Sequence, residues 1–182
     1  MQDPKWQIHG YAIVCEDGCI ADASGALPRA LMNDADWAYF QAELDRADIT
    51  ILGRTSHEAT PNLKRRRRVV MTRAAAGLDQ AEELVLFWNP EIVPIDAMLM
   101  RLLPEGGRVA IPGGSAPFGL FLPRFDGFHL SRKAGIRLSG GTQLFPTAAP
   151  TPEAALSLAG MTPGEVQDID PEDGVTLTVW TR

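Results

Sequence analysis

Short apolar runs alternate with amphipathic stretches along most of this chain. The runs have the length and the content of Ile, Val, Leu and aromatic residues that are typical of buried strands. They span 7–14, 48–52, 69–71 and 84–88. Helices are predicted by apolar residues at helical spacing over 34–47 and 95–103, and a hairpin by the Asp-Gly turn between 165–169 and 175–180. This order predicts an α/β fold with a mostly parallel central sheet, helices on both faces and an antiparallel C-terminal hairpin.

Two shorter helices carry signals at their first residues. Thr55 and Glu58 have the spacing of a capping box, so a short helix is expected to begin at Thr55 and to stop before Pro61. A second helix is expected after Thr151, which is a good cap, with Pro152 as its first residue.

The composition suits one domain over 1–182. The chain has 182 residues, of which 45% are hydrophobic, and this is enough for a substantial core. No apolar run approaches the ~20 residues of a membrane span, and residues 1–5 lack the basic and then apolar pattern of a signal peptide. Cys15 and Cys19 are too few for a disulfide framework. We therefore expect a cytoplasmic protein.

Neither a metal site nor general nucleic-acid binding is expected. His9, His57 and His129 lie far apart in the sequence without a local His or Cys partner, and His129 is expected to be structural. The formal net charge of −6 argues against nucleic acid as a partner. Residues 64–68 form a run of five cations. Such a run is more often a solvated loop than an anion contact, and a nucleic-acid contact is the weaker alternative.

A pair of glycines follows the apolar stretch 108–112. Gly113 and Gly114 let a ligand approach the backbone without an intervening side chain. Ser115 and Ala116 begin the next helix, whose free N–H groups and positive end favour a phosphate. For an isolated Gly-Gly pair, a tight strand-to-helix turn without a ligand is the commoner interpretation.

Two other predicted strands each end in hydroxyl groups and an arginine. These residues are Gly53, Arg54, Thr55 and Ser56 after one strand, and Thr72 and Arg73 after the other. A guanidinium group beside backbone N–H groups suits a phosphate. Ligands of open α/β sheets bind outside the carboxyl ends of the strands, so both segments are candidates for an anion site.

Asp36 is the first candidate for catalysis. It precedes Phe40 by one helical turn and lies at the edge of an apolar helical face. The pattern alone favours a plainer interpretation, in which Asp36 is a first-turn acid that interacts with the helix dipole.

The order and spacing of these segments resemble the dihydrofolate reductase-like superfamily, over about residues 8–146. The segments that carry the resemblance are 17–25, 36–40, 51–56, 69–73, 111–115, 121–123 and 141–146. The superfamily includes dihydrofolate reductases and the reductase domain of riboflavin-biosynthesis deaminase-reductases. The resemblance implies a three-layer fold and a reductase that uses NADPH. The motif of the deaminase half, His-x-Glu with Pro-Cys-x-x-Cys, is absent from the sequence.

The resemblance also implies roles for individual residues. Asp36 would be the catalytic carboxylate, with Ser131 as the hydroxyl near it, and Trp37 and Phe40 would contact the substrate. The implied cofactor-binding residues are Ile20 in a lid, Gly53, Arg54, Thr55, Ser56, Thr72, Arg73, Gly113, Gly114, Ser115 and Ala116. Among these, Arg54, Thr72 and Arg73 would hold the adenosine 2′-phosphate that distinguishes NADPH from NADH.

Two substrate classes stay open at this point. Asp36 and Phe40 resemble dihydrofolate reductase, and Arg66 is a candidate for the cation that holds a folate's glutamate tail. The loop 17–25 instead resembles the riboflavin-type reductases, whose substrate is a ribosylamino-pyrimidine phosphate. Hydride transfer to a small pyrimidine- or pteridine-like substrate is the leading hypothesis. A non-catalytic NADP(H)-binding sensor or assembly protein is the alternative. The resemblance to riboflavin-type reductases also implies a homodimer.

Overall fold

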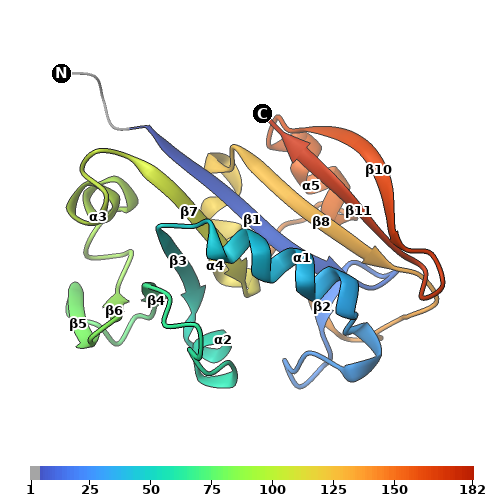
Figure 1. Ribbon diagram of the computed structural model, residues 1–182, viewed down its shortest axis with the longest axis horizontal. Coiled ribbons are helices and arrows are strands. Elements are labelled where there is room, and N and C mark those ends of the chain that lie inside the picture. The colour runs from blue at the N-terminus through green and yellow to red at the C-terminus, as the bar shows by residue number, and fades with distance from the viewer. Residues whose placement is uncertain (1–4) are drawn as a thin grey trace.

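The computed structural model describes residues 5–182 and contains one nine-stranded sheet (Figure 1). Residues 1–4, which belong to the segment compared with a signal peptide, lie outside the described residues. The strands are β1 (Trp6–Val14), β2 (Cys19–Ala21), β3 (Ile49–Gly53), β4 (Arg68–Met71), β5 (Leu78–Glu82), β6 (Val85–Trp88), β7 (Gly107–Gly113), β8 (Gly127–Lys133), β9 (Thr142–Gln143), β10 (Thr162–Asp170) and β11 (Val175–Thr181). The α-helices are α1 (Asp34–Asp45), α2 (Arg54–Ala59), α3 (Ile95–Leu102), α4 (Ser115–Phe121) and α5 (Pro152–Leu158), and two 3-10 helices are η1 (Arg29–Leu31) and η2 (Leu122–Arg124).

The centre of the sheet is parallel and both of its edges are antiparallel. The strand order is β10-β11-β8-β1-β7-β3-β4-β6-β5. All pairs from β8 to β6 are parallel. The hairpin of β10 and β11 closes one edge and β5 closes the other, both in antiparallel pairing. This arrangement confirms the predicted α/β fold with its C-terminal hairpin, and it brings the carboxyl ends of the central strands to one edge.

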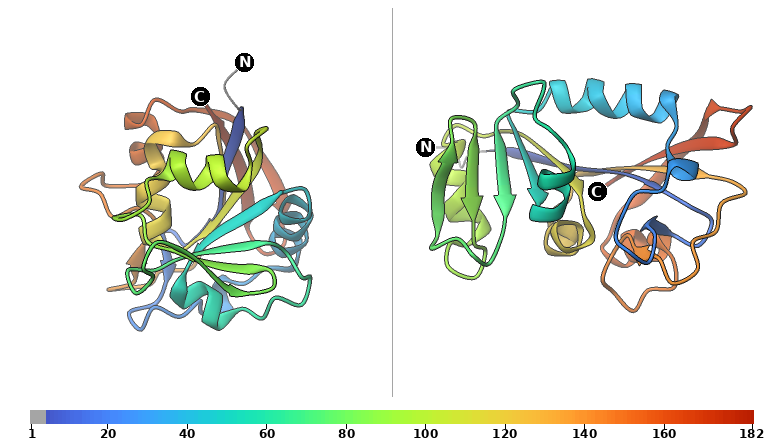
Figure 2. Two further views of the ribbon diagram at one scale, coloured as in Figure 1. Left: turned by 90° about the vertical axis from the view of Figure 1, so that its left-hand side faces the viewer. Right: turned by 90° about the horizontal axis from the view of Figure 1, so that it is seen from below.

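Helices cover both faces of the sheet (Figure 2). On one face, α1 packs Phe40 and Leu44 against Tyr11 and Ala110. On the other face, α3, α4 and α5 bury the larger hydrophobic core. Among residues 5–182, the largest fully buried side chains are Trp88, Phe118, Phe121, Phe125 and Phe128. The sheet and the helices on its two faces form three layers. The loops that follow the parallel strands lie at the carboxyl edge of the sheet.

The start of α2 differs from the sequence prediction. The helix begins at Arg54, with Gly53 as its N-cap and no hydrogen bond from a capping side chain. The predicted capping box at Thr55 is therefore wrong, because Thr55 already lies within the first turn. The signal for α5 is confirmed, since Oγ1 of Thr151 accepts a hydrogen bond from the backbone N–H of Ala154 at 3.1 Å.

Three short strands were not predicted. β2 and β9 have three and two residues and pair only with each other, so neither is long enough to show a period. β5 is largely exposed and polar, and it lies at the edge of the sheet next to β6.

Among residues 5–182, no helix has the length and apolar content to cross a membrane, and no three His, Cys, Asp or Glu side chains gather where they could hold a metal ion.

Candidate functional site

The carboxyl ends of β7, β3 and β4 lie side by side. Leu52 pairs with Gly113, and Gly53 pairs with the last residue of β4. The segments that follow the three strands are therefore neighbours. A Cβ atom built on Gly53 would lie 3.7 Å from the backbone nitrogen of Gly114, and one built on Gly114 would lie 3.8 Å from Oγ of Ser56. Gly53, Ser56 and Gly114 are thus near neighbours.

The two glycines at the end of β7 have different surroundings. Gly113 has a φ of +118°, a conformation that side chains disfavour, and its peptide bond to Gly114 is cis. A Cβ atom on Gly113 would come within 3.0 Å of Cε2 of Phe118, whereas Gly114 meets only Ser56 at ordinary contact distance. Gly113 therefore packs on the core, and Gly114 presents bare backbone to the space beside Ser56.

Ser115 and Ala116 form the first turn of α4. Oγ of Ser115 lies 2.8 Å from the carbonyl oxygen of Gln143 and 3.2 Å from that of Leu144. The hydroxyl group therefore ties α4 to the segment that contains β9. Ala116 is exposed on the same turn.

The two arginines of the predicted anion site are both exposed. Nε of Arg54 donates to Oε1 of Glu58 at 2.7 Å, and both side chains of this ion pair are more than half exposed. Arg73 is exposed two residues after the end of β4. Thr55 is exposed on α2, and Oγ1 of Thr72 accepts a hydrogen bond from a backbone N–H two residues further on. Because an exposed ion pair contributes little stability, Glu58 does not prevent Arg54 from binding another anion.

Asp36 lies in the first turn of α1, facing β8. The backbone N–H of Asp36 donates to Oδ1 of Asn33, the N-cap of the helix. Burial raises the pKa of the Asp36 carboxyl group above its ordinary value, and a hydrogen bond with the Ser131 side chain partly opposes this rise. Ser131 is itself 1% exposed. The structure thus brings together the two residues that the resemblance paired.

Helix α1 also carries two aromatic side chains close to Asp36 in the sequence, Trp37 and Phe40. The ring centroid of Phe40 lies 5.6 Å from that of Trp37 and 6.3 Å from that of Tyr11. Trp37 is 52% exposed. The exposed indole gives a face that can stack on a flat ring.

A buried polar layer lies between α1 and the sheet. The hydroxyl oxygen of Tyr39 lies 2.5 Å from Nδ1 of His129, and Nε2 of His129 lies 3.1 Å from Nδ1 of His9. The hydroxyl group of Tyr11 donates to Oε2 of Glu43 at 3.2 Å. Burial, helped by the neighbouring His9, lowers the pKa of His129 to about 4, and burial raises the pKa of Tyr39 to about 12. This layer joins α1 to β1 and β8.

Glu43 is a buried residue of this layer that was not singled out in the sequence. It is 6% exposed, and its carboxylate lies 2.5 Å from Nη1 of Arg46 and 3.6 Å from Nη2 of Arg108. The helical spacing of Phe40 and Leu44 places position 43 on the buried side of α1. A charged residue on the buried side of a helix indicates a polar contact beneath the helix, so Glu43 could have been identified from the sequence.

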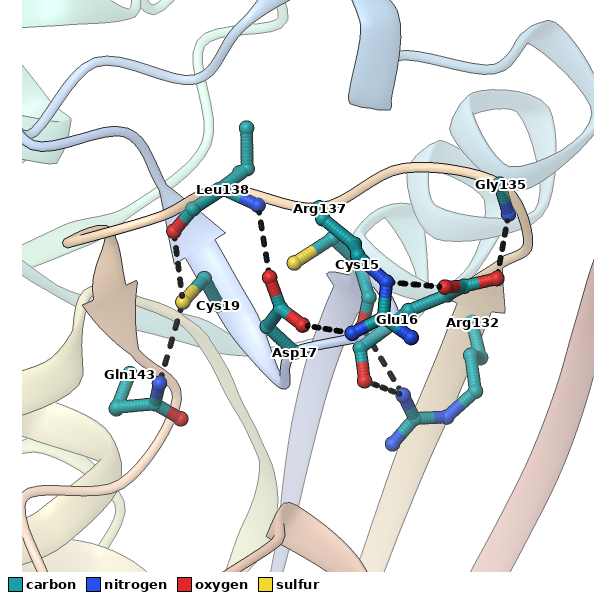
Figure 3. A network of polar contacts seen from close by, with 9 residues as sticks. All are labelled: Cys15, Glu16, Asp17, Cys19, Arg132, Gly135, Arg137, Leu138 and Gln143. Carbon is teal, nitrogen blue, oxygen red and sulfur yellow. Dashed lines mark hydrogen bonds and ion pairs between the residues drawn. The ribbon is translucent and has the colours of Figure 1, made fainter.

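The turn that leads from β1 into the lid segment is fixed by polar contacts (Figure 3). The backbone N–H of Cys15 donates to the carbonyl oxygen of Cys19 at 3.1 Å. The carboxylate of Asp17 accepts from Nη1 of Arg137 at 2.9 Å and from the backbone N–H of Leu138 at 3.0 Å. The contacts anchor this turn to the loop after β8.

Ile20 follows this turn and is partly buried against the main core. The next residues form a compact turn, because Oδ1 of Asp22 accepts hydrogen bonds from the backbone N–H groups of Ser24 at 2.8 Å and Ala26 at 3.2 Å. The segment predicted to be a lid is therefore anchored at Asp17 and forms a local turn over residues 22–26.

Solved structures with the same arrangement are known. The "putative riboflavin biosynthesis protein" of Shewanella sp. PV-4 is 19% identical, with a TM-score of 0.65, and the match covers 97% of this chain and 98% of that one. Dihydrofolate reductase from Enterococcus faecalis, solved in complex with NADP(H) and RAB-propyl, is 19% identical, with a TM-score of 0.66 and coverage of 100% and 99%. The chain has the dihydrofolate reductase-like fold.

A third structure with this fold is the bifunctional diaminohydroxyphosphoribosylaminopyrimidine deaminase/5-amino-6-(5-phosphoribosylamino)uracil reductase of Thermotoga maritima. It is 16% identical, with a TM-score of 0.66, and the match covers 97% of this chain but 56% of that one. No family model matches the sequence, and no curated protein matches it. At these identities the comparisons establish the fold, and the function has to be argued from the site.

The basic run 64–68 lies between α2 and β4, and all five of its side chains contact other parts of the chain. Their partners are Asp45 for Lys64, Glu83 for Arg65, Asp45 and Gln41 for Arg66, the Leu102 carbonyl for Arg67, and the Thr60 carbonyl and His57 for Arg68. The side chain of Arg66 is 13% exposed. The run is therefore a solvated loop at Lys64 and Arg65, whose side chains are 57% and 68% exposed, whereas Arg68 is buried and Arg66 is held by α1.

Proposed function

We propose that this chain is an NADPH-dependent reductase that transfers a hydride to a small heterocyclic substrate, similar to dihydrofolate reductase or to the riboflavin-biosynthesis reductase domain. The observation that carries the proposal is the meeting of Gly53, Ser56 and Gly114 at the carboxyl ends of the adjacent parallel strands β3 and β7, with the end of β4 beside them. Arg54 and Arg73 follow two of these strands and are exposed.

The residues at this edge fit a dinucleotide that carries phosphates. Gly53 and Gly114 bring backbone without side chains close to Ser56, which adds a hydroxyl group. Two guanidinium groups supply the positive charge that an additional 2′-phosphate requires. When bound, NADPH supplies the hydride, and the protein positions the two rings and excludes water.

In this proposal Asp36 binds the polar edge of the substrate and supports protonation of the reduced ring. Burial keeps this carboxyl group protonated to a higher pH than an exposed aspartate, which suits a group that passes on a proton. A hydrogen bond with Ser131 helps to orient it, and Trp37 offers a face for the ring to stack on. The neighbours solved as dihydrofolate reductase and as a uracil-type reductase support this assignment by fold alone.

The substrate class in this proposal is a pyrimidine- or pteridine-like ring without a long anionic tail. Nη2 of Arg66 lies 2.5 Å from Oδ1 of Asp45 and 2.8 Å from Oε1 of Gln41. A glutamate tail of the folate type would have to displace Asp45 to reach this guanidinium. The contact therefore favours a ribosylamino-pyrimidine over a folate. We extend the proposal to the whole chain as one reductase domain acting as a cytoplasmic homodimer, and light scattering on the purified protein tests the dimer.

The experiment has two stages. Calorimetric titration with NADPH and with NADH tests the cofactor, and we expect tight binding of NADPH only. Oxidation of NADPH is then followed with dihydrofolate and with 5-amino-6-(5-phosphoribosylamino)uracil, in the wild type and in Asp36→Ala. Turnover that depends on Asp36 supports the reductase. Binding of NADPH without its consumption by any pyrimidine or pteridine supports the alternative of a non-catalytic sensor, and equal or no binding of both dinucleotides removes the proposal.

A further inference from the structure

The first residue before α1 is held by the tip of the C-terminal hairpin. Asn33 caps the helix through Oδ1, which accepts from the backbone N–H of Asp36 at 3.0 Å. Its Nδ2 donates in the other direction, to Oδ2 of Asp170 at 2.8 Å and to Oδ2 of Asp173 at 2.9 Å. One amide side chain therefore links the turn between β10 and β11 to the backbone of the candidate catalytic residue.

A buried lysine makes a second link at the same place. Lys133, the last residue of β8, is 7% exposed. Its Nζ donates to the carbonyl oxygen of Met32 at 3.1 Å and to Oδ2 of Asp173 at 2.5 Å. The lysine thus holds the residue before Asn33, and Asp173 bonds to both links.

The same strand also contacts the carboxyl group itself. Ser131 precedes Lys133 by two residues on β8, so both side chains point to the face that α1 covers. Ser131 bonds to the Asp36 side chain, and Lys133 bonds to the backbone two residues before α1. Strand β8 therefore contacts both the Asp36 side chain, through Ser131, and the residues just before α1, through Lys133.

We propose that Asp173, acting through Lys133 and Asn33, is a positioning residue that holds the Asp36 carboxyl group beside Ser131. The assignment of a reaction to Asp36 rests on the function proposed above, whereas the positioning itself does not. A buried ammonium group needs an ionised partner, and Asp173 is the carboxylate that lies against it. Hydrogen bonds from Lys133 and then from Asn33 lower the pKa of Asp173, so it stays ionised at neutral pH.

Two variants separate positioning from simple stability. Asp173→Asn removes the charge opposite Lys133. Asn33→Ser keeps a good N-cap but removes the amide group that reaches Asp170 and Asp173, so α1 should still form. The matched control is Asp96→Asn, which breaks a charged contact with Arg124 far from α1, at 2.5 Å in the wild type.

The readouts are the pKa of Asp36, from the NMR pH titration of its carboxyl carbon, and kcat with the substrate that the wild type turns over. We expect both variants to shift the pKa of Asp36 and to lower kcat by ~10–100-fold, with the affinity for NADPH unchanged, because a small misplacement of a reacting group has this effect. Asp96→Asn should change neither quantity.

Wild-type values of both readouts in Asp173→Asn and Asn33→Ser would overturn the proposal, even if the melting temperature fell. If Asp36→Ala keeps full turnover, the catalytic role of Asp36 is wrong, but the titration of Asp36 still decides the positioning. An unchanged pKa in both variants overturns it in that case, and a shifted pKa supports it.

Discussion

The hydroxyl oxygen of Tyr39 on α1 lies 2.5 Å from Nδ1 of His129 on β8. His129 in turn contacts Nδ1 of His9 through its Nε2 at 3.1 Å. Both contacts are satisfied when Tyr39 donates to a neutral His129, which then donates from Nε2 to His9. Protonation of both imidazoles places two N–H donors against each other, and burial disfavours a positive charge on either ring. The layer that attaches α1 to the sheet therefore depends on neutral histidines.

Stability should fall as the pH is lowered from about 6.5 to about 4. His129 has a pKa of about 4 in the folded state, against 6.5 when unfolded. In this interval the unfolded state binds more protons, so the free energy of unfolding decreases with decreasing pH, by up to ~3 kcal/mol for His129. Urea unfolding at several pH values measures this slope.

The control for this prediction is His129→Gln, which can still accept from Tyr39 and donate to His9 but does not titrate. The slope should become shallower in the variant. His9 contributes in the same direction, because burial and then Arg108 lower its pKa, against the opposing effects of Asp126 and Glu43. Equal slopes in the wild type and in His129→Gln would show that the histidine layer does not govern the acid response.

Asp36→Asn should make the protein more stable at neutral pH and inactive. The folded-state pKa of Asp36 is raised, so the contribution of this carboxyl group to stability is lost as the pH rises through that pKa. The amide avoids this loss, and the variant should melt at a higher temperature than the wild type at pH 7, with no advantage below the unfolded-state pKa of about 3.9. Turnover should fall by ~10²–10⁴-fold because no proton is available from this position. A variant that is less stable than the wild type at pH 7 would contradict the desolvation of Asp36.

Arg54 and Glu58 give a direct test of the phosphate contact. Arg54→Ala should weaken the binding of NADPH by about 1.5 kcal/mol, or ~10-fold. The binding of NADH should be unaffected, because only NADPH carries the additional phosphate. Arg73→Ala should act in the same way. Glu58→Gln should instead strengthen NADPH binding, because it removes the anion 2.7 Å from Nε of Arg54. Calorimetric titration with both dinucleotides measures these effects, and equal losses for NADPH and NADH in Arg54→Ala would place its contact elsewhere on the cofactor.

The sequence predicted the parts of the fold that have a clear period. The buried parallel strands, the helix that carries Asp36 and the cap of α5 at Thr151 were all predicted, because each depends on residues close in sequence. The predicted start of α2 was one residue too late, because the capping-box pattern depends on side chains and does not show that the backbone of Arg54 is already helical. The partners of the basic run were not predictable, because Asp45 and Glu83 become neighbours only through the sheet.

For the candidate site, the sequence identified residues and the tertiary structure supplied their relations. The nearness of Gly53 to Gly114 follows from the order of β7 and β3, and local spacing does not determine that order. Lys133 contacts Met32, which is 101 positions away in the sequence, and Asp173, which is 40 positions away. Such contacts need the register of β8 against β11 before they can be inferred.

Substitution by alanine should have different effects on stability and on cofactor binding at the two glycines of the β7–α4 turn. Gly113→Ala places a Cβ atom 3.0 Å from the Phe118 ring on backbone with a φ of +118°, so it should destabilise the fold by ~1–3 kcal/mol. Gly114→Ala meets only Oγ of Ser56, at 3.8 Å, and should cost less stability. It should nevertheless weaken the binding of NADPH and of NADH equally, by on the order of 10-fold or more, because the methyl group keeps a diphosphate away from the backbone. Thermal unfolding and dinucleotide titration of both variants separate the two effects. Wild-type affinity in a folded Gly114→Ala protein would mean that the dinucleotide does not lie over this backbone.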